Sequence, residues 1–165
     1  MTKLLERIPS KSDKELMSLL HNALKHQDKK LTTQVISEIY KVWRSRAVLA
    51  QLGEYKTDLD ADGVLSAFGY HVGNFGITDA GQRQKLLALI FEADLPPVLS
   101  PEYILEWGQP SSKQRLRKLS RVLRGLVSSK SKQVPNKKSL KRAVDHWKDD
   151  LSFLAQRFSH TLNAF

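Results

Sequence analysis

Cysteine is missing from the 165-residue sequence. Its absence excludes a disulfide framework, a thiolate zinc site, an iron–sulfur cluster and a cysteine nucleophile together. Long hydrophobic runs are missing as well: the longest, such as residues 86–91, has six residues, whereas a membrane span needs about 20. The first residues also lack the apolar segment of a secretory signal. We therefore expect a cytoplasmic protein that makes no contact with membranes.

The rest of the composition is ordinary for a globular protein. Hydrophobic residues make up 41% and charged residues 27% of the chain, with 8 glycines and 6 prolines. This length is typical of one domain with a single buried core. We expect residues 1–165 to form a single helical domain, in which residues 1–52 form a helical hairpin and residues 53–165 a helical body.

Acidic residues are nearly absent from one segment. Residues 111–148 contain 13 Lys/Arg and one Asp, whereas residues 53–110 contain 3 Lys/Arg and 9 Asp/Glu; the whole chain carries a net charge of +10. A cationic block of this kind is typical of a surface that binds a polyanion. The acidic segment of the same molecule could equally neutralise it, so two interpretations remain open.

Helical periodicity and helix-capping residues run through the sequence, and no alternating strand pattern accompanies them. Ser12 and Glu15 form a capping box, and Pro101 follows a serine that can cap the next helix. The pattern predicts an all-α fold of six or seven helices, with the N-terminal hairpin packed on the body. The expected helices are 13–26, 31–47, 64–68, 79–91, 101–107, 113–127 and 139–158.

Two junctions precede the last two helices. Ser111 or Ser112 is expected to cap the helix over 113–127, and Ser139 the final helix. Between them, residues 128–138 have no apolar periodicity, which predicts a basic, mobile loop.

An acidic segment, residues 58–65, reproduces the first eight positions of an EF-hand calcium loop. The closing bidentate Glu of such a loop would stand at position 69, where this chain has Gly69. We therefore expect no calcium at physiological concentrations. Asp58, Asp60 and Asp62 are expected to be exposed, or to cap the short helix that follows.

No pattern for catalysis or for a cofactor stands out. The five histidines do not pair at helical spacing, and there is no Gly-x-Ser-x-Gly motif. Residues 69–76 are rich in glycine but lack the Lys-Ser/Thr of a phosphate-binding loop, so a structural turn is the better interpretation. We expect a protein that is not an enzyme and that has no metal or other cofactor.

The helix over 113–127 carries cations of a single sign opposite its leucines, with Arg115 alone on the apolar border. Any amphipathic helix needs a solvated face, but mixed signs are usual there. Arg115 is a candidate for an internal salt bridge with the acidic segment. The candidate nucleic-acid-binding residues are Lys113, Arg117, Lys118, Arg121, Arg124, Lys138 and Lys141.

A series of short motifs spans residues 69–158: Gly-Tyr-x-Val-Gly from Gly69, Leu95-Pro96, Trp107-Gly108, Pro110-Ser111, Arg115-Leu116-x-Lys118-Leu119 and Trp147-x-x-Asp150-Leu151-x-x-Leu154. In this order they resemble an uncharacterised bacterial C-terminal helical module found in mobile-element or defence-associated proteins. The resemblance implies no activity, cofactor or catalytic residue. It implies that the characteristic polar and aromatic residues of the module are Arg83, Trp107, Ser111, Arg115 and Asp150. Of these, Ser111 is expected to cap a helix, Trp107 to lie in the core and Arg115 to bridge to a carboxylate.

Two functions follow from these patterns. The first is a non-enzymatic nucleic-acid-binding or accessory module that contacts phosphates of DNA or RNA through the basic helix. The second is a protein-interaction module, either monomeric or oligomeric, in which Phe153 and a surface with Trp43 and the hairpin bind another protein. The sequence leaves open the choice of DNA or RNA, the protein partner and the oligomeric state.

Overall fold

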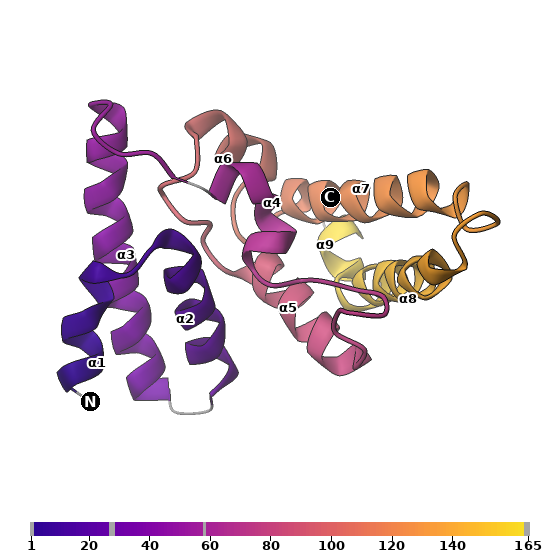
Figure 1. The fold of residues 1–165 in the computed structure, drawn as a ribbon, viewed down its shortest axis with the longest axis horizontal. Helices are drawn as coiled ribbons and strands as arrows, with labels where there is room; N and C mark the ends of the chain where they lie inside the picture. The colour runs from indigo at the N-terminus through magenta and orange to yellow at the C-terminus, as the bar shows by residue number, and fades with distance from the viewer. Residues whose placement is uncertain (1, 27–28, 58, 164–165) are drawn as a thin grey trace. The chain divides into compact units, whose positions relative to one another are not determined.

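The computed structural model describes residues 2–26, 29–57 and 59–163 (Figure 1). Over these ranges the chain forms α-helices and short 3-10 helices and no β-strand, so the predicted all-α class is confirmed. Seven helices, α2 to α8, correspond to the seven expected. The other two in the described ranges, α1 (Thr2–Arg7) and α9 (Ser159–Asn163), are too short to leave a periodic pattern in the sequence.

The chain divides into two compact units. Unit 1 contains residues 1–69 and 95–104, and unit 2 contains residues 70–94 and 105–165. These units differ from the expected hairpin and body, because residues 53–69 and 95–104 group with the hairpin. The single-domain assignment stays a prediction. Unit 1 carries 11 Lys/Arg and 10 Asp/Glu, and unit 2 carries 16 and 7, so unit 2 holds nearly all of the positive excess.

Unit 1 is built on the predicted hairpin of α2 (Asp13–Lys25) and α3 (Lys29–Gln51), which pack against each other. The capping box that starts α2 is confirmed: the Glu15 amide donates to Ser12 Oγ at 3.4 Å, and the Ser12 amide donates to Glu15 Oε2 at 2.8 Å. A 3-10 turn, η1 (Ile8–Ser10), packs on α3, and α4 (Leu59–Ala67) packs on α2.

A buried carboxylate links the start of α2 to α3. Asp13 is buried, and its Oδ1 accepts hydrogen bonds from Trp43 Nε1 at 3.0 Å and Arg46 Nη1 at 2.7 Å. Its other oxygen accepts from the Tyr55 hydroxyl. Trp43 is completely buried, so the expectation that it belongs to an interaction surface was wrong. Its ring is part of the core of unit 1, and its N–H donates to Asp13.

The segment that resembles a calcium loop lies at α4. Asp58 and the side chains of Asp60 and Asp62 lie outside the described part of the structure, so their expected exposure or capping role stays a prediction. Gly63 interrupts α4 with φ of 71°. The helix resumes at Val64, whose amide donates to the Tyr103 hydroxyl at 3.1 Å.

Unit 2 contains α5 (Ala80–Glu92), α7 (Lys113–Ser131) and α8 (Lys141–Arg157), which pack on one another. Helix α6 (Pro101–Trp107) leads from the residues of unit 1 into those of unit 2. The side chain of Asp79 caps α5 by accepting from the Gln82 amide at 2.7 Å. Trp107, expected in the core, is buried.

Ser112, not Ser111, caps α7, because its hydroxyl accepts from the Arg115 amide at 3.1 Å. Ser111 instead adopts a left-handed conformation with φ of 55°, and its amide donates to the Phe91 carbonyl at 2.9 Å. The N-cap of α7 is therefore Ser112, one residue later than the Ser111 cap that the resemblance implied.

Two further expectations near the end of α7 were wrong. Helix α7 continues to Ser131, so residues 128–131 are helical although their apolar pattern has stopped. Ser139 does not cap α8: it lies in the 3-10 turn η2 (Lys138–Leu140), which runs directly into α8, and the N-cap Leu140 has helical φ and ψ. When a helix follows a 3-10 turn directly, its first amides can donate to the carbonyls of that turn, so a serine cap is not needed.

Candidate nucleic-acid interface

The orientation of α7 decides which cations face solvent. Leu116, Leu119 and Leu123 are buried on one side of the helix. On the opposite side, Arg117, Arg121 and Arg124 are exposed and form a row at spacings of four and three residues. At a rise of about 1.5 Å per residue, the row extends for about 10 Å along the helix.

Arg115 is the one cation of this helix that points into the core, as the sequence predicted, and it fixes the start of α7. Its side chain is almost completely buried. The guanidinium donates to the carbonyl oxygens of Ile90 at 2.9 Å, Trp107 at 3.0 Å and Gly108 at 2.6 Å. Its bridge to a carboxylate stays a prediction, but these contacts hold the first turn of α7 against α5 and the end of α6.

A second buried cluster attaches α5 to α8. Asp150 Oδ2 accepts from Arg83 Nε at 2.9 Å and from the Tyr70 hydroxyl at 2.7 Å, and all three side chains are buried. Burial and the hydrogen bond to the Asp150 carboxylate raise the pKa of Tyr70. Because α5, α7 and α8 are fixed in this way, their exposed side chains are presented on a rigid framework.

The seven candidate residues fall into three groups. Arg117, Arg121, Arg124 and Lys138 are exposed, and within the described residues none of them lies within 4 Å of a carboxylate oxygen. Lys118 and Lys141 are ion-paired, with Glu106 and with Asp145 respectively, the latter at 3.2 Å. Lys113 is half-buried in the first turn of α7.

Glu106 is a carboxylate on which a charge of the arginine row, that of Arg121, acts. The hydrogen bond and charge of Lys118 lower the pKa of Glu106, and Arg121 contributes weakly in the same direction. Glu106 is therefore ionised at neutral pH and offsets Lys118. Glu106 is thus ion-paired with Lys118 rather than with an arginine of the row.

The end of the α7–α8 hairpin gathers further cations. Antiparallel packing places the last turns of α7 beside the first turns of α8, as Figure 1 shows at the connection between them. We call this region the hairpin tip; its cations are Arg124, Lys130, Lys132, Lys137, Lys138, Lys141 and Arg142. Asp145 is the one acid in residues 111–148, so the hairpin tip is strongly positive. The structure thus places the arginine row and Lys138 and Lys141 on one helical hairpin, formed by α7, η2 and α8.

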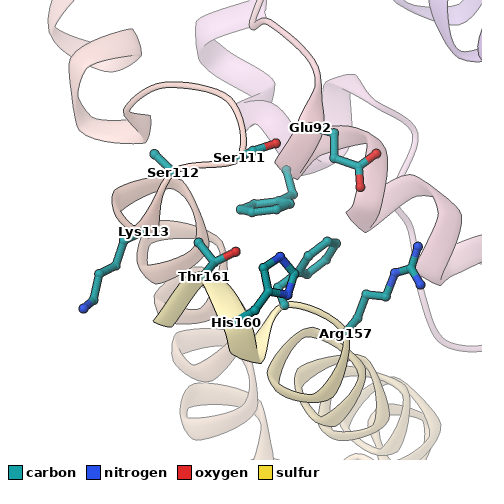
Figure 2. A pocket seen from close by; sticks show the side chains of 9 residues that line it. Glu92, Ser111, Ser112, Lys113, Arg157, His160 and Thr161 are labelled. Atoms are coloured by element: carbon teal, nitrogen blue, oxygen red, sulfur yellow. The ribbon is translucent and has the colours of Figure 1, made fainter. Parts of the chain in front are cut away.

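Lys113 also borders a cavity of about 690 Å³ (Figure 2). Phe91 and Phe158, whose ring centroids are 4.2 Å apart, contribute its apolar part, and Arg157 and His160 lie at its edge with Glu92. Figure 2 shows the Lys113 ammonium group directed away from the ring pair. Lys113 is therefore half-buried at the border of the cavity with its charge directed away from the ring pair, and Glu92 and Arg157 bring charges of both signs to the cavity.

Phe153, the other residue expected on an interaction surface, is half-buried and packs edge-to-face on Phe158 with a centroid distance of 6.2 Å. Arg142 was absent from the candidate set although it is exposed at the hairpin tip. The sequence already counts Arg142 among the cations of this segment, beside Lys141, and the structure shows it exposed.

The described residues form neither a cluster of metal ligands nor a membrane-spanning helix. Among the described residues no three His, Asp or Glu side chains gather as metal ligands do. Nor is any described helix both long and apolar enough to cross a bilayer. Comparisons with protein-family models, with curated proteins and with solved structures found no match.

Proposed function

We propose that this protein is a non-enzymatic module that binds nucleic acid through the basic surface of unit 2. The observation that carries the proposal is the exposed row of Arg117, Arg121 and Arg124 on α7, the helix that leads into the cations of the hairpin tip. Arginine pairs well with phosphate oxygens because its planar guanidinium donates in a fork. Contacts of this kind position a nucleic acid without reading its sequence.

Charge distribution supports the same proposal. Solubility alone requires only that the solvated face of an amphipathic helix carry charges, and these are usually of both signs. The solvated face of α7 is instead almost entirely cationic. Unit 2, with a net charge of +9, supplies the long-range attraction that brings a polyanion to the surface.

Salt dependence is the first test. Binding of fluorescently labelled generic DNA and RNA is measured by anisotropy at several salt concentrations. If about five phosphates are neutralised, the affinity for duplex DNA falls by about 500-fold between about 50 and 200 mM salt. An affinity that does not change with salt contradicts phosphate binding.

A charge reversal locates the surface. Arg117→Glu combined with Arg121→Glu should abolish binding and leave the melting temperature unchanged, because both side chains are exposed. The matched control is Lys30→Glu with Arg44→Glu, which changes the net charge equally on exposed positions of α3 in unit 1. Equal losses from both pairs would show that only total charge matters.

A second candidate function is protein binding through unit 1. Val48 and Leu52 at the end of α3 are 57% and 67% exposed, and Leu49 beside them is also exposed. An apolar cluster on a helix end is typical of a protein contact. Size-exclusion chromatography with light scattering separates the candidates: a tight dimer that binds neither DNA nor RNA favours protein binding. A role in a mobile-element or defence system rests on the resemblance of residues 69–158 and belongs to either candidate.

A further inference from the structure

Phe75 stands out among the apolar side chains of unit 2. It lies in the segment between α4 and α5, and its exposed area is 106% of that of a reference Phe, so it contacts almost nothing. Among the residues whose exposure the structure describes, the other large exposed apolar residues lie in unit 1, apart from Leu105 on α6. Isolated exposed apolar residues are common, so the exposure of Phe75 needs support from its surroundings.

The loop that carries Phe75 has a defined shape. Gly73 has φ of 91°, and a Cβ there would lie 3.2 Å from the Cβ of Ala143 on α8. A Cβ on Gly76 would lie 2.5 Å from the carbonyl carbon and oxygen of His71. The Ile77 amide donates to this same carbonyl at 2.8 Å and closes the loop. Close packing on both sides of Phe75 therefore holds its backbone while its ring stays in solvent.

The loop is anchored where α8 is most basic. The Gly73 amide donates to Nδ1 of His146 at 3.4 Å, and Gly73 also packs on Ala143. Arg142 precedes Ala143 and lies one helical turn before His146 on the same face, where its charge acts on the His146 ring. Arg142 is exposed and belongs to the hairpin tip. The loop that carries Phe75 is thus held against the first turns of α8, which carry Lys141 and Arg142 of the hairpin tip.

An exposed aromatic ring beside phosphate-binding cations suits single-stranded nucleic acid. Bases of any sequence stack on such rings, and the cations follow the backbone. A duplex offers no unpaired base faces along its length. A protein anchor usually sits within an apolar cluster, whereas Leu105 is the one other large exposed apolar side chain in the described part of unit 2. The surroundings of Phe75 therefore favour an unpaired nucleotide over a duplex or a protein.

We infer that Phe75 and Arg142 form a site for an unpaired nucleotide, in which the base stacks on the Phe75 ring and the adjoining phosphate pairs with Arg142. This inference rests on the proposed function and narrows its ligand to nucleic acid with single-stranded segments.

Three probes separate stacking from phosphate binding. They are an oligothymidylate of about 20 nucleotides, which exceeds common site sizes, an abasic backbone of the same length, and a duplex of that length. The abasic probe has the same phosphates and no bases. We expect the full-length protein to bind the oligothymidylate about tenfold more tightly than the abasic probe.

Substitutions assign this difference to residues. Phe75→Ala should remove the tenfold preference and leave abasic and duplex binding unchanged, whereas Phe75→Trp should keep it. Arg142→Glu should weaken binding of all three probes and reduce the salt slope by about one to two phosphate contacts. Leu105→Ala, which removes a 71% exposed apolar side chain from α6, is the control and should leave the preference unchanged.

Phe75→Trp also gives a direct signal. The three native tryptophans are buried, so iodide quenches chiefly the new indole. Oligothymidylate should protect it from iodide, and the abasic probe should not.

Each outcome decides between the two proposals. If no probe binds, the proposed function is refuted and the inference falls with it. If all probes bind and Phe75→Ala leaves the preference unchanged at a native melting temperature, only the inference is overturned. If light scattering shows a dimer that Phe75→Ala dissociates, the ring is a protein contact and the inference is again overturned.

Discussion

Asp150→Asn tests the buried cluster that joins α5 to α8. The substitution keeps the side-chain volume and removes the negative charge, so Arg83 remains buried without its counter-ion. The Asp150 and Arg83 side chains are 0% and 2% exposed. Breaking a buried ion pair by removing one partner costs about 3–5 kcal/mol.

Residual contacts place the expected value at the lower end of this range. Arg83 still donates to the Thr78 carbonyl at 2.9 Å and to the Ile77 carbonyl at 3.4 Å, and Asn retains one acceptor. We therefore expect a loss of about 3 kcal/mol. For a chain of this size, that loss lowers the melting temperature by about 6–12 °C.

Urea unfolding followed by circular dichroism measures the change. With a slope of about 2 kcal/mol per molar urea, the midpoint should fall by about 1.5 M. Asp149→Asn removes the same charge from the neighbouring, exposed position of α8 and should cost less than about 0.5 kcal/mol. Equal midpoints for the two variants would refute the reasoning. As a second measure, Asp150→Leu with Arg83→Met should be less destabilised than the sum of the single changes, because no unpaired charge remains buried.

Two further predictions concern the loop of Phe75 and helix α7. Burial, followed by the charges of Arg83 and Arg142, lowers the pKa of His146 below 6.5 against the opposing effect of Asp150 and Asp149; the neutral ring that accepts from Gly73 is therefore the stable native form. The stability that the neutral His146 ring contributes should be present above pH 6.5 and lost as the pH falls below it. Amide exchange of Gly73 should therefore accelerate in acid, and the melting temperature of the native protein should fall more than that of His146→Gln. Equal pH profiles of the two proteins contradict this. Gly125→Ala should raise the free energy of unfolding by about 0.5–1 kcal/mol, because Gly125 lies inside α7 and a Cβ there meets nothing within 4 Å, whereas Gly73→Ala should lower it. Urea midpoints check both, and a destabilised Gly125→Ala would contradict the geometry.

The all-α class and most helix ends could be predicted because their causes are local. A capping box such as that of Ser12 and Glu15, or the cap at Asp79, acts within one helical turn and is written in adjacent residues. Helix periodicity likewise identified Leu116, Leu119 and Leu123 as the buried side of α7, which placed Arg117, Arg121 and Arg124 opposite. The continuation of α7 through residues 128–131 was missed, because polar residues extend a helix without adding to its apolar stripe.

Tertiary structure alone decided the partners of the buried charges and the surroundings of Phe75. Asp150 meets Arg83 and Tyr70, which are 67 and 80 residues away, and nothing in the local pattern selects one carboxylate among several for such a contact. In the sequence, Phe75 is an ordinary apolar residue between two glycines. Only the structure shows that it is fully exposed and that its loop packs through Gly73 on Ala143 of α8, next to Arg142 in sequence. Local sequence fixes a helix and its faces, because those forces act over a few residues, whereas the meeting of distant side chains depends on how the helices pack.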